Sequence, residues 1–194
     1  MALSRSDLWS LEQYAERRDD YRKKVITHKK YRQVQLSEHA RLLFEDAMTV
    51  QYQIQEMLRI EKVFETKGIE EELDTYNPLI PDGTNWKATF MLEYNDIDER
   101  KVALENLIGV EDQIWMQVGV SEKIYAIADE DLERDNGVKT ASVHFLRFEL
   151  SIEMILDVQA GAEITAGCDH SALNISGITL DQETTNSLAS DLNI

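Results

Sequence analysis

The stretch "TVQYQIQEMLRIEKVF", Thr49 to Phe64, has the pattern of a helix that buries one face. A helix turns by about 100° per residue, and on that wheel five apolar side chains share one arc. They are Val50, Ile54, Met57, Leu58 and Phe64. The spacing predicts an amphipathic helix over about residues 47–65 that buries one side. The same arc also contains Gln53 and Glu61, which need partners because a buried unpaired polar group costs about 1–3 kcal/mol.

Two interpretations of this polar pair stay open. In the structural one, Glu61 pairs with an arginine such as Arg147, and Gln53 bonds to backbone at a strand edge. In the functional one, both line a polar pocket together with "ELDTYN", residues 72–77. A carboxylate whose pKa is raised by burial in such a pocket would be a candidate acid or base.

The first part of the chain, up to about residue 76, is predicted to be mostly helical. A helix is expected over residues 5–30, with Ser6 or Asp7 at its start. "YRQVQL" and "ARLLFED" alternate as strands do and form a short hairpin around the turn "SEH". The helix over 47–65 follows, and then a shorter helix over "GIEEELDTY", residues 68–76.

The rest of the chain favours a mostly antiparallel sheet with a few short helices. "NPLIPDGTN" is a loop at residues 77–85. Strands are expected at 86–94, 112–119, 122–129 and 140–150, with a polar loop at 133–137. Helices are expected at 96–109, lined by Val102, Ala103 and Leu107, at 151–159, and near the end at 181–194. A last hairpin turns at "CDHS", residues 168–171.

Together, these predicted helices and strands indicate an α+β fold, with residues 1–194 as a single domain. A division into two parts would fall in the loop 77–85.

Composition limits the function classes. The chain has 194 residues, a net charge of −17 and one cysteine. One cysteine makes neither an intramolecular disulfide nor a zinc knot or iron–sulfur site. The acidity argues against nucleic acid as a partner. No signal peptide or membrane-spanning run is expected, which indicates a cytoplasmic protein.

The charge is unevenly distributed. Residues 1–60 carry 11 Lys and Arg against 9 Asp and Glu, whereas residues 61–194 carry 9 against 28. The basic residues concentrate in "RKKVITHKKYR", Arg22 to Arg32. This segment is either a solvated helix end or a docking patch for an acidic partner or phosphate.

Several catalytic and metal motifs are absent from the sequence. Neither a GxGxxG nor a GxxxxGK[ST] phosphate loop occurs, and there is no GxSxG elbow. The four histidines belong to no HExxH or Glu-x-x-His pair. No cofactor and no metal site are predicted, although abundant carboxylates leave an oxygen-ligated divalent ion such as Mg²⁺ or Mn²⁺ open.

Two further positions have alternative interpretations. "GCDHS" gathers Cys168 and His170 as a nucleophile or ligand pair, or forms a plain polar hairpin turn. Arg147, inside the apolar strand "VHFLRFEL", is either an anion clamp or reaches the sheet edge and meets a glutamate.

Four segments together resemble the uncharacterised bacterial domain-of-unknown-function family 3501 over about residues 5–150. They are "DLWSLEQY", "VQLSEHARLLFEDAMTVQYQIQEMLRIE", "ELDTYNPLIP" and "VHFLRFEL". The resemblance brings no established activity and no catalytic role to transfer. The family's genes often lie beside those for a rubrerythrin-like protein and an iron–sulfur oxidoreductase, which implies an accessory role near redox chemistry.

The expected function is therefore an accessory protein that docks on a protein partner, which the resemblance suggests is a redox protein, without catalysis of its own. Assembly with further copies of the chain is left open. The alternative is a small-ligand binder or enzyme whose polar pocket is built from the helices at 47–77 and Arg147. The candidate surface or pocket contains ten residues: Glu45, Gln53, Gln55, Glu56, Arg59, Glu61, Asp74, Tyr76, Asn77 and Arg147.

Overall fold

The computed structural model describes all residues except 1, 131–133, 135–136 and 194. The α-helices are α1 Leu11–Lys29, α2 Ala47–Glu61, α3 Thr66–Tyr76, α4 Ile97–Asn106, α5 Ile152–Gln159 and α6 Gln182–Ala189. The 3₁₀ turns among these described residues are η1 Arg5–Asp7, η2 Asn77–Leu79 and η3 Glu111–Gln113. The strands are β1 Gln33–Gln35, β2 Ala40–Phe44, β3 Asn85–Leu92, β4 Ile114–Val118, β5 Ile124–Tyr125, β6 Ile127–Ala128, β7 Val143–Glu149, β8 Ile164–His170 and β9 Leu173–Thr179. The predicted loop at 133–137 lies mostly outside the described residues.

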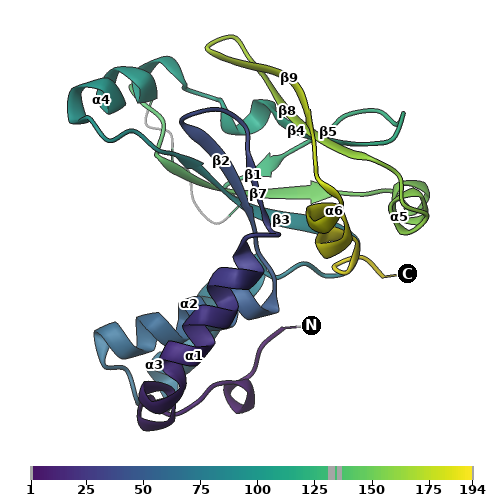
Figure 1. The fold of residues 1–194 in the computed structure, drawn as a ribbon. Coiled ribbons are helices and arrows are strands. Elements are labelled where there is room, and N and C mark those ends of the chain that lie inside the picture. Colours follow the sequence, from purple (N-terminus) through teal and green to yellow (C-terminus); the bar gives the residue numbers. More distant parts are fainter. Residues whose placement is uncertain (1, 131–133, 135–136, 194) are drawn as a thin grey trace.

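The strands form two antiparallel sheets (Figure 1). The five-stranded sheet has the order β1-β2-β3-β7-β6, and the four-stranded sheet has the order β5-β4-β8-β9. One buried core cluster takes in Trp86 and Phe90 of β3, Phe148 of β7, Met116 of β4 and Ile164 of β8. The α+β class is confirmed, with two sheets where the sequence indicated one.

A strand that changes sheets joins the two layers. The segment predicted as one strand at 122–129 is divided: Tyr125 in β5 pairs with Trp115 of β4, whereas Ile127 in β6 pairs with Arg147 of β7. The crossover carries the chain from the four-stranded to the five-stranded sheet. It leaves Asp129 beside β7, where its backbone N–H donates to the carbonyl of Phe145 at 2.8 Å.

Helix α2 buries the side that the sequence predicts, but it ends at Glu61 and not near residue 65. Val50, Ile54 and Leu58 are at most 2% exposed, as predicted. The helix ends at Glu61, since the next residue, Lys62, has a φ of 56° in the left-handed region. Phe64 therefore leaves the apolar arc and is 71% exposed, which contradicts its predicted burial.

Two other helix predictions need correction. The first helix begins at Leu11 and not at residue 5, because the side chain of Ser10 accepts a hydrogen bond from the backbone N–H of Gln13 and caps the start. In α4, Val102 is 57% exposed, and Leu104 is the buried residue. The side chain of Asp96 caps the start of α4.

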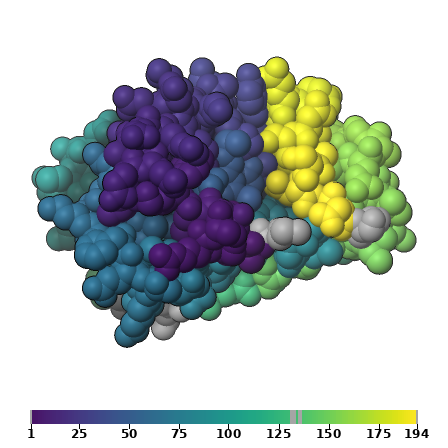
Figure 2. Space-filling view, turned by 90° about the horizontal axis from the view of Figure 1, so that it is seen from below, coloured from purple at the N-terminus to yellow at the C-terminus, as the bar shows by residue number. Residues whose placement is uncertain are grey.

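The C-terminal helix packs beside the N-terminal part of the chain (Figure 2). Arg32, which follows α1, donates to the carboxylate of Asp191 and to the hydroxyl of Ser187, and its side chain is 1% exposed. The predicted last helix is thus ordered, as α6. The last hairpin is also present, but its turn lies at Ser171 and Ala172. None of the helices in the described part of the chain is long and apolar enough to cross a membrane.

Candidate functional site

A cavity of about 380 Å³ opens on the face of the five-stranded sheet that turns away from the core. On one side it is lined by the end of α3 and by η2, including Asp74, Tyr76 and Leu79. On the other side it is lined by β3 and β7. Side chains alternate across a strand, so Trp86 and Phe148 point into the core while their neighbours reach the cavity.

Two cations lie next to each other on the strand side of this cavity. Lys87 of β3 and Arg147 of β7 are direct partners in the antiparallel register, and both line the cavity. Like charges opposite each other in a sheet repel, so each needs compensation. Arg147 is compensated: it donates to both carboxylate oxygens of Glu130, at 2.8 and 2.9 Å, and to Glu149 at 2.5 Å.

Of the two interpretations of Arg147, the structure therefore supports the ion pair with a glutamate near the sheet edge and not the anion clamp. Hydrogen bonds from Arg147 lower the pKa of Glu130 below its usual range. The structural interpretation of Glu61, in which it pairs with an arginine such as Arg147, is not supported, because Glu61 is exposed at the end of α2 and Arg147 bonds Glu130 and Glu149.

Lys87 is the lining cation that forms no direct ion pair with a carboxylate of the described residues. Its ammonium donates to the carbonyl of Pro78 at 2.6 Å. Within the described part of the chain, no carboxylate lies within ion-pair distance of it. Burial is the main cause that lowers the pKa of Lys87, and the Arg147 charge adds to it, while the charges of Asp82, Glu130 and Glu149 oppose it. A partly buried positive charge thus borders an apolar cavity that also contains Phe145 and Tyr76.

Three of the ten candidate residues meet at this cavity: Asp74, Tyr76 and Arg147. Asn77, next to them in sequence, is used elsewhere. Its side chain bonds the backbone N–H and carbonyl of Leu3 at 2.7 and 2.9 Å and holds the N-terminal segment on η2. Helix α2 does not line the cavity, so the pocket expected from both helices is built from α3 alone and the sheet.

The α2 candidates serve the packing of the N-terminal helices. The buried amide on α2 is Gln55, which is 0% exposed, whereas Gln53 is only partly buried. The Gln55 side chain accepts from the backbone N–H of Trp9 at 2.7 Å and donates to its carbonyl at 3.4 Å. Glu56 accepts two hydrogen bonds from Arg18 at 2.7 Å, which lower its pKa.

The remaining candidates also lie outside the cavity. Glu45 is 3% exposed and accepts from the hydroxyls of Thr49 and Thr89 at 2.5 and 2.7 Å. Arg59 and Glu61 are exposed near the end of α2. The prediction that Gln53 and Glu61 share the buried arc is wrong for Glu61, which is exposed where α2 ends.

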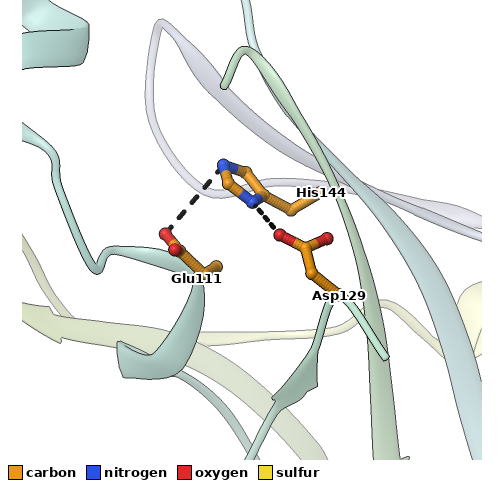
Figure 3. Close-up of side chains that lie close together, drawn as sticks. All are labelled: Glu111, Asp129 and His144. Atoms are coloured by element: carbon orange, nitrogen blue, oxygen red, sulfur yellow. Dashed lines mark hydrogen bonds and ion pairs between the residues drawn. The ribbon is translucent and has the colours of Figure 1, made fainter. Parts of the chain in front are cut away.

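A second cluster, between the sheets, centres on His144 (Figure 3). His144 is 0% exposed, and its Nδ1 lies 2.6 Å from the carboxylate of Asp129. Its Nε2 points to the opposite side, 2.9 Å from Thr140 Oγ1, 3.1 Å from the Ala141 carbonyl and 3.9 Å from Glu111 Oε2. Glu111, Asp129 and His144 offer ligand atoms within 4.8 Å of one another.

The ten candidate residues predicted from the sequence include neither Lys87 nor Glu111, Asp129 or His144. One signal was available: His144 shares the apolar face of "VHFLRFEL" with Leu146 and Phe148, both buried. Its partners come from separate segments whose approach depends on the strand that changes sheets. In the structure, Cys168 and His170 of "GCDHS" do not form a nucleophile or ligand pair. Cys168 is buried in β8, where burial raises the pKa of its thiol, and His170 Nε2 contacts the carbonyl of Ile108.

Comparisons with known proteins agree with the family resemblance. Residues 2–192 match the family described as "Protein of unknown function (DUF3501)". The crystal structure of a novel protein of unknown function from Burkholderia pseudomallei K96243 is 49% identical. It superposes with a TM-score of 0.96 over 100% of both chains. No curated protein matches the chain. The chain therefore belongs to the DUF3501 family.

Proposed function

We propose that this protein binds a small anionic molecule with an apolar body in the cavity lined by Lys87, Phe145 and Tyr76. The observation that carries the proposal is the Lys87 ammonium, which borders the cavity without a carboxylate partner among the described residues. A cavity of about 380 Å³ falls in the range of small-molecule sites, which combine apolar walls with a few polar anchors.

The chemistry of the walls limits the ligand class. Glu130 and Glu149 are both bonded to Arg147, so among the described residues Lys87 is the lining cation that can bond an anionic group of a ligand directly. The rings of Phe145 and Tyr76 and the side chain of Leu79 favour an aromatic or aliphatic body. The predicted ligands are small apolar carboxylates, sulfonates or phosphates.

The probe for this prediction is 1-anilinonaphthalene-8-sulfonate, which joins an aromatic body to one sulfonate. We expect saturable fluorescence enhancement with one site per chain. Lys87→Met should weaken binding about tenfold, because it removes a charge-assisted contact of about 1.4 kcal/mol. Thr75→Trp, at an exposed position on the cavity wall, should block binding by filling space while leaving every charge in place.

Lys101→Met is the matched control, since Lys101 is an exposed lysine of α4 outside the cavity. Circular dichroism of each variant establishes that the fold is intact. Binding that is equal in wild type, Lys87→Met and Thr75→Trp would place the probe elsewhere and overturn the proposal.

We also propose a second function, docking of an acidic protein partner on the end of α1. The observation that favours it is a group of exposed cations in a chain of net charge −17: Arg22, Lys23, Lys24 and Lys30. Ile26 and Tyr31 lie among them with 45% and 38% of their surfaces exposed. Apolar side chains framed by charge are common at transient interfaces, where charge steers association. The partner implied by the family resemblance is a cytoplasmic redox protein.

Docking is tested with the purified rubrerythrin-like protein encoded beside this family. Reversing Arg22, Lys23 and Lys24 to glutamate should weaken binding at least tenfold, and the wild-type affinity should fall with added salt. The control reverses three exposed cations elsewhere, Arg59, Lys62 and Lys101, and gives the same net charge. Interferometry that shows equal affinity for both triple variants would contradict docking at α1.

A further inference from the structure

We propose that His144, Glu111 and Thr140 hold one divalent transition-metal ion between the two sheets, and that Asp129 is the positioning residue for His144. This site is separate from the cavity and does not depend on the function proposed for it. The three donor atoms are His144 Nε2, Glu111 Oε2 and Thr140 Oγ1. The Ala141 carbonyl, 3.1 Å from Nε2, is available as a fourth donor.

The donor spacing fits an ion. The distances are 2.9 Å from Nε2 to Oγ1, 3.4 Å from Oγ1 to Oε2, and 3.9 Å from Oε2 to Nε2. A single point lies about 2.0 Å from all three corners of this triangle, which is the usual length of metal–nitrogen and metal–oxygen bonds. By contrast, 3.9 Å is too long for a hydrogen bond between His144 and Glu111.

The other side of the imidazole is fixed as in known metal sites. Asp129 lies 2.6 Å from Nδ1 and is itself held by the backbone N–H of Phe145 at 3.0 Å and by Arg134 at 2.9 Å. A ligating histidine commonly donates its second ring N–H to a carboxylate, which sets its tautomer and orientation. With the Nδ1 hydrogen on the Asp129 side, the Nε2 lone pair points at Glu111 and Thr140.

The charge balance calls for a cation at that point. Arg134 compensates Asp129. Glu111 is 7% exposed, and within the described residues its polar contacts are the 3.4 Å bond from Thr140 and His144 at 3.9 Å. A carboxylate this buried and this weakly bonded is unfavourable without a closer positive charge. One imidazole with oxygen donors suits Zn²⁺ or Mn²⁺.

Such an ion would connect η3, the segment before β7, and β7 itself. The expected effect is therefore stabilisation of the chain by metal binding. The test begins with protein stripped by a chelator and dialysed, which is then titrated with Zn²⁺ and, separately, with Mn²⁺ by calorimetry. We expect one equivalent of ion to bind and the melting temperature to rise.

Glu111→Gln keeps the side-chain shape and should weaken binding at least a hundredfold. Thr140→Val is a second shape-conserving variant, and Asp129→Asn should weaken binding about 10–100-fold through His144. The matched control is Glu99→Gln, because Glu99 lies 3.8 Å from His39 in an otherwise similar but exposed pair. Its removal should leave the affinity unchanged.

Two results would overturn the site. One is the absence of saturable binding to the folded wild-type chain by either ion. The other is unchanged affinity in Glu111→Gln and Thr140→Val, which would make the cluster a hydrogen-bond network alone. Circular dichroism checks that each variant is folded. If Glu111→Gln or Thr140→Val does not fold, the metal affinity of the other variant tests the site.

Discussion

Replacing Arg32 with methionine is expected to lower the free energy of unfolding by about 3–5 kcal/mol, because it leaves a buried carboxylate without its cation. The Arg32 side chain is 1% exposed and that of Asp191 is 8% exposed. The guanidinium donates to Asp191 at 2.5 Å and also to the backbone carbonyls of Phe44 and Glu45. Methionine fills similar space but satisfies none of these acceptors.

The effect should depend on pH in a defined direction. Burial raises the pKa of Asp191 to about 6, although Arg32 opposes this rise. The folded carboxyl therefore binds a proton more tightly than the unfolded one, so its contribution to stability grows as pH falls through about 6. Without Arg32 the pKa rises further. The stability gap between variant and wild type should narrow from about pH 7.5 to about pH 5.

Urea denaturation at both pH values measures this gap. His28 and Asp46 also face the cluster, and they are present in both proteins, so their titration largely cancels in the difference. Arg59→Met, at an exposed position on α2, serves as the control and should change stability by less than about 0.5 kcal/mol. A loss below about 1 kcal/mol for Arg32→Met would show that this pair does not hold α6 to the hairpin.

Gly167→Ala is expected to destabilise the four-stranded sheet by about 3 kcal/mol, through crowding and not through a strained backbone. A Cβ at this position would lie 2.2 Å from Trp115 Cζ2 and 2.6 Å from the Ile175 carbonyl. Trp115 is the direct register partner of Gly167 and is 1% exposed. The melting temperature should fall by about 6–12 °C in a chain of this size.

A double-mutant cycle identifies the clash. In a Trp115→Leu background, the ring that meets the new methyl is gone, and Gly167→Ala should cost at least about 1.5 kcal/mol less than in wild type. The contact with the Ile175 carbonyl keeps the remaining cost above zero. Additive effects of the two substitutions would mean that the indole does not set the requirement for glycine here.

The regular elements of this fold follow from local patterns. The alternation of Trp86, Ala88, Phe90 and Leu92 predicts a strand with one core face, and all four are at most 4% exposed. The arc of Val50, Ile54 and Leu58 predicts α2 in the same way. What local pattern does not contain is the exchange between sheets after Tyr125, because pairing partners lie far away in the chain.

The same dependence on distant pairing partners explains which site residues could be predicted from the sequence. Asp74 and Tyr76 belong to one motif, and Arg147 is a charge inside an apolar strand, so the sequence associates all three with a pocket. Lys87 could not be associated with it in this way, because its significance comes from the register that sets it opposite Arg147. An idealised wheel places Gln53 on the apolar arc of α2, whereas the position of the Trp9 backbone makes Gln55 the buried, hydrogen-bonded amide.

The most direct test of the central claim is a crystal structure of the chain with 1-anilinonaphthalene-8-sulfonate. We expect the sulfonate within hydrogen-bond distance of Lys87 Nζ, and the naphthalene ring against Phe145 and Tyr76. Probe density on another surface with this cavity empty would contradict it.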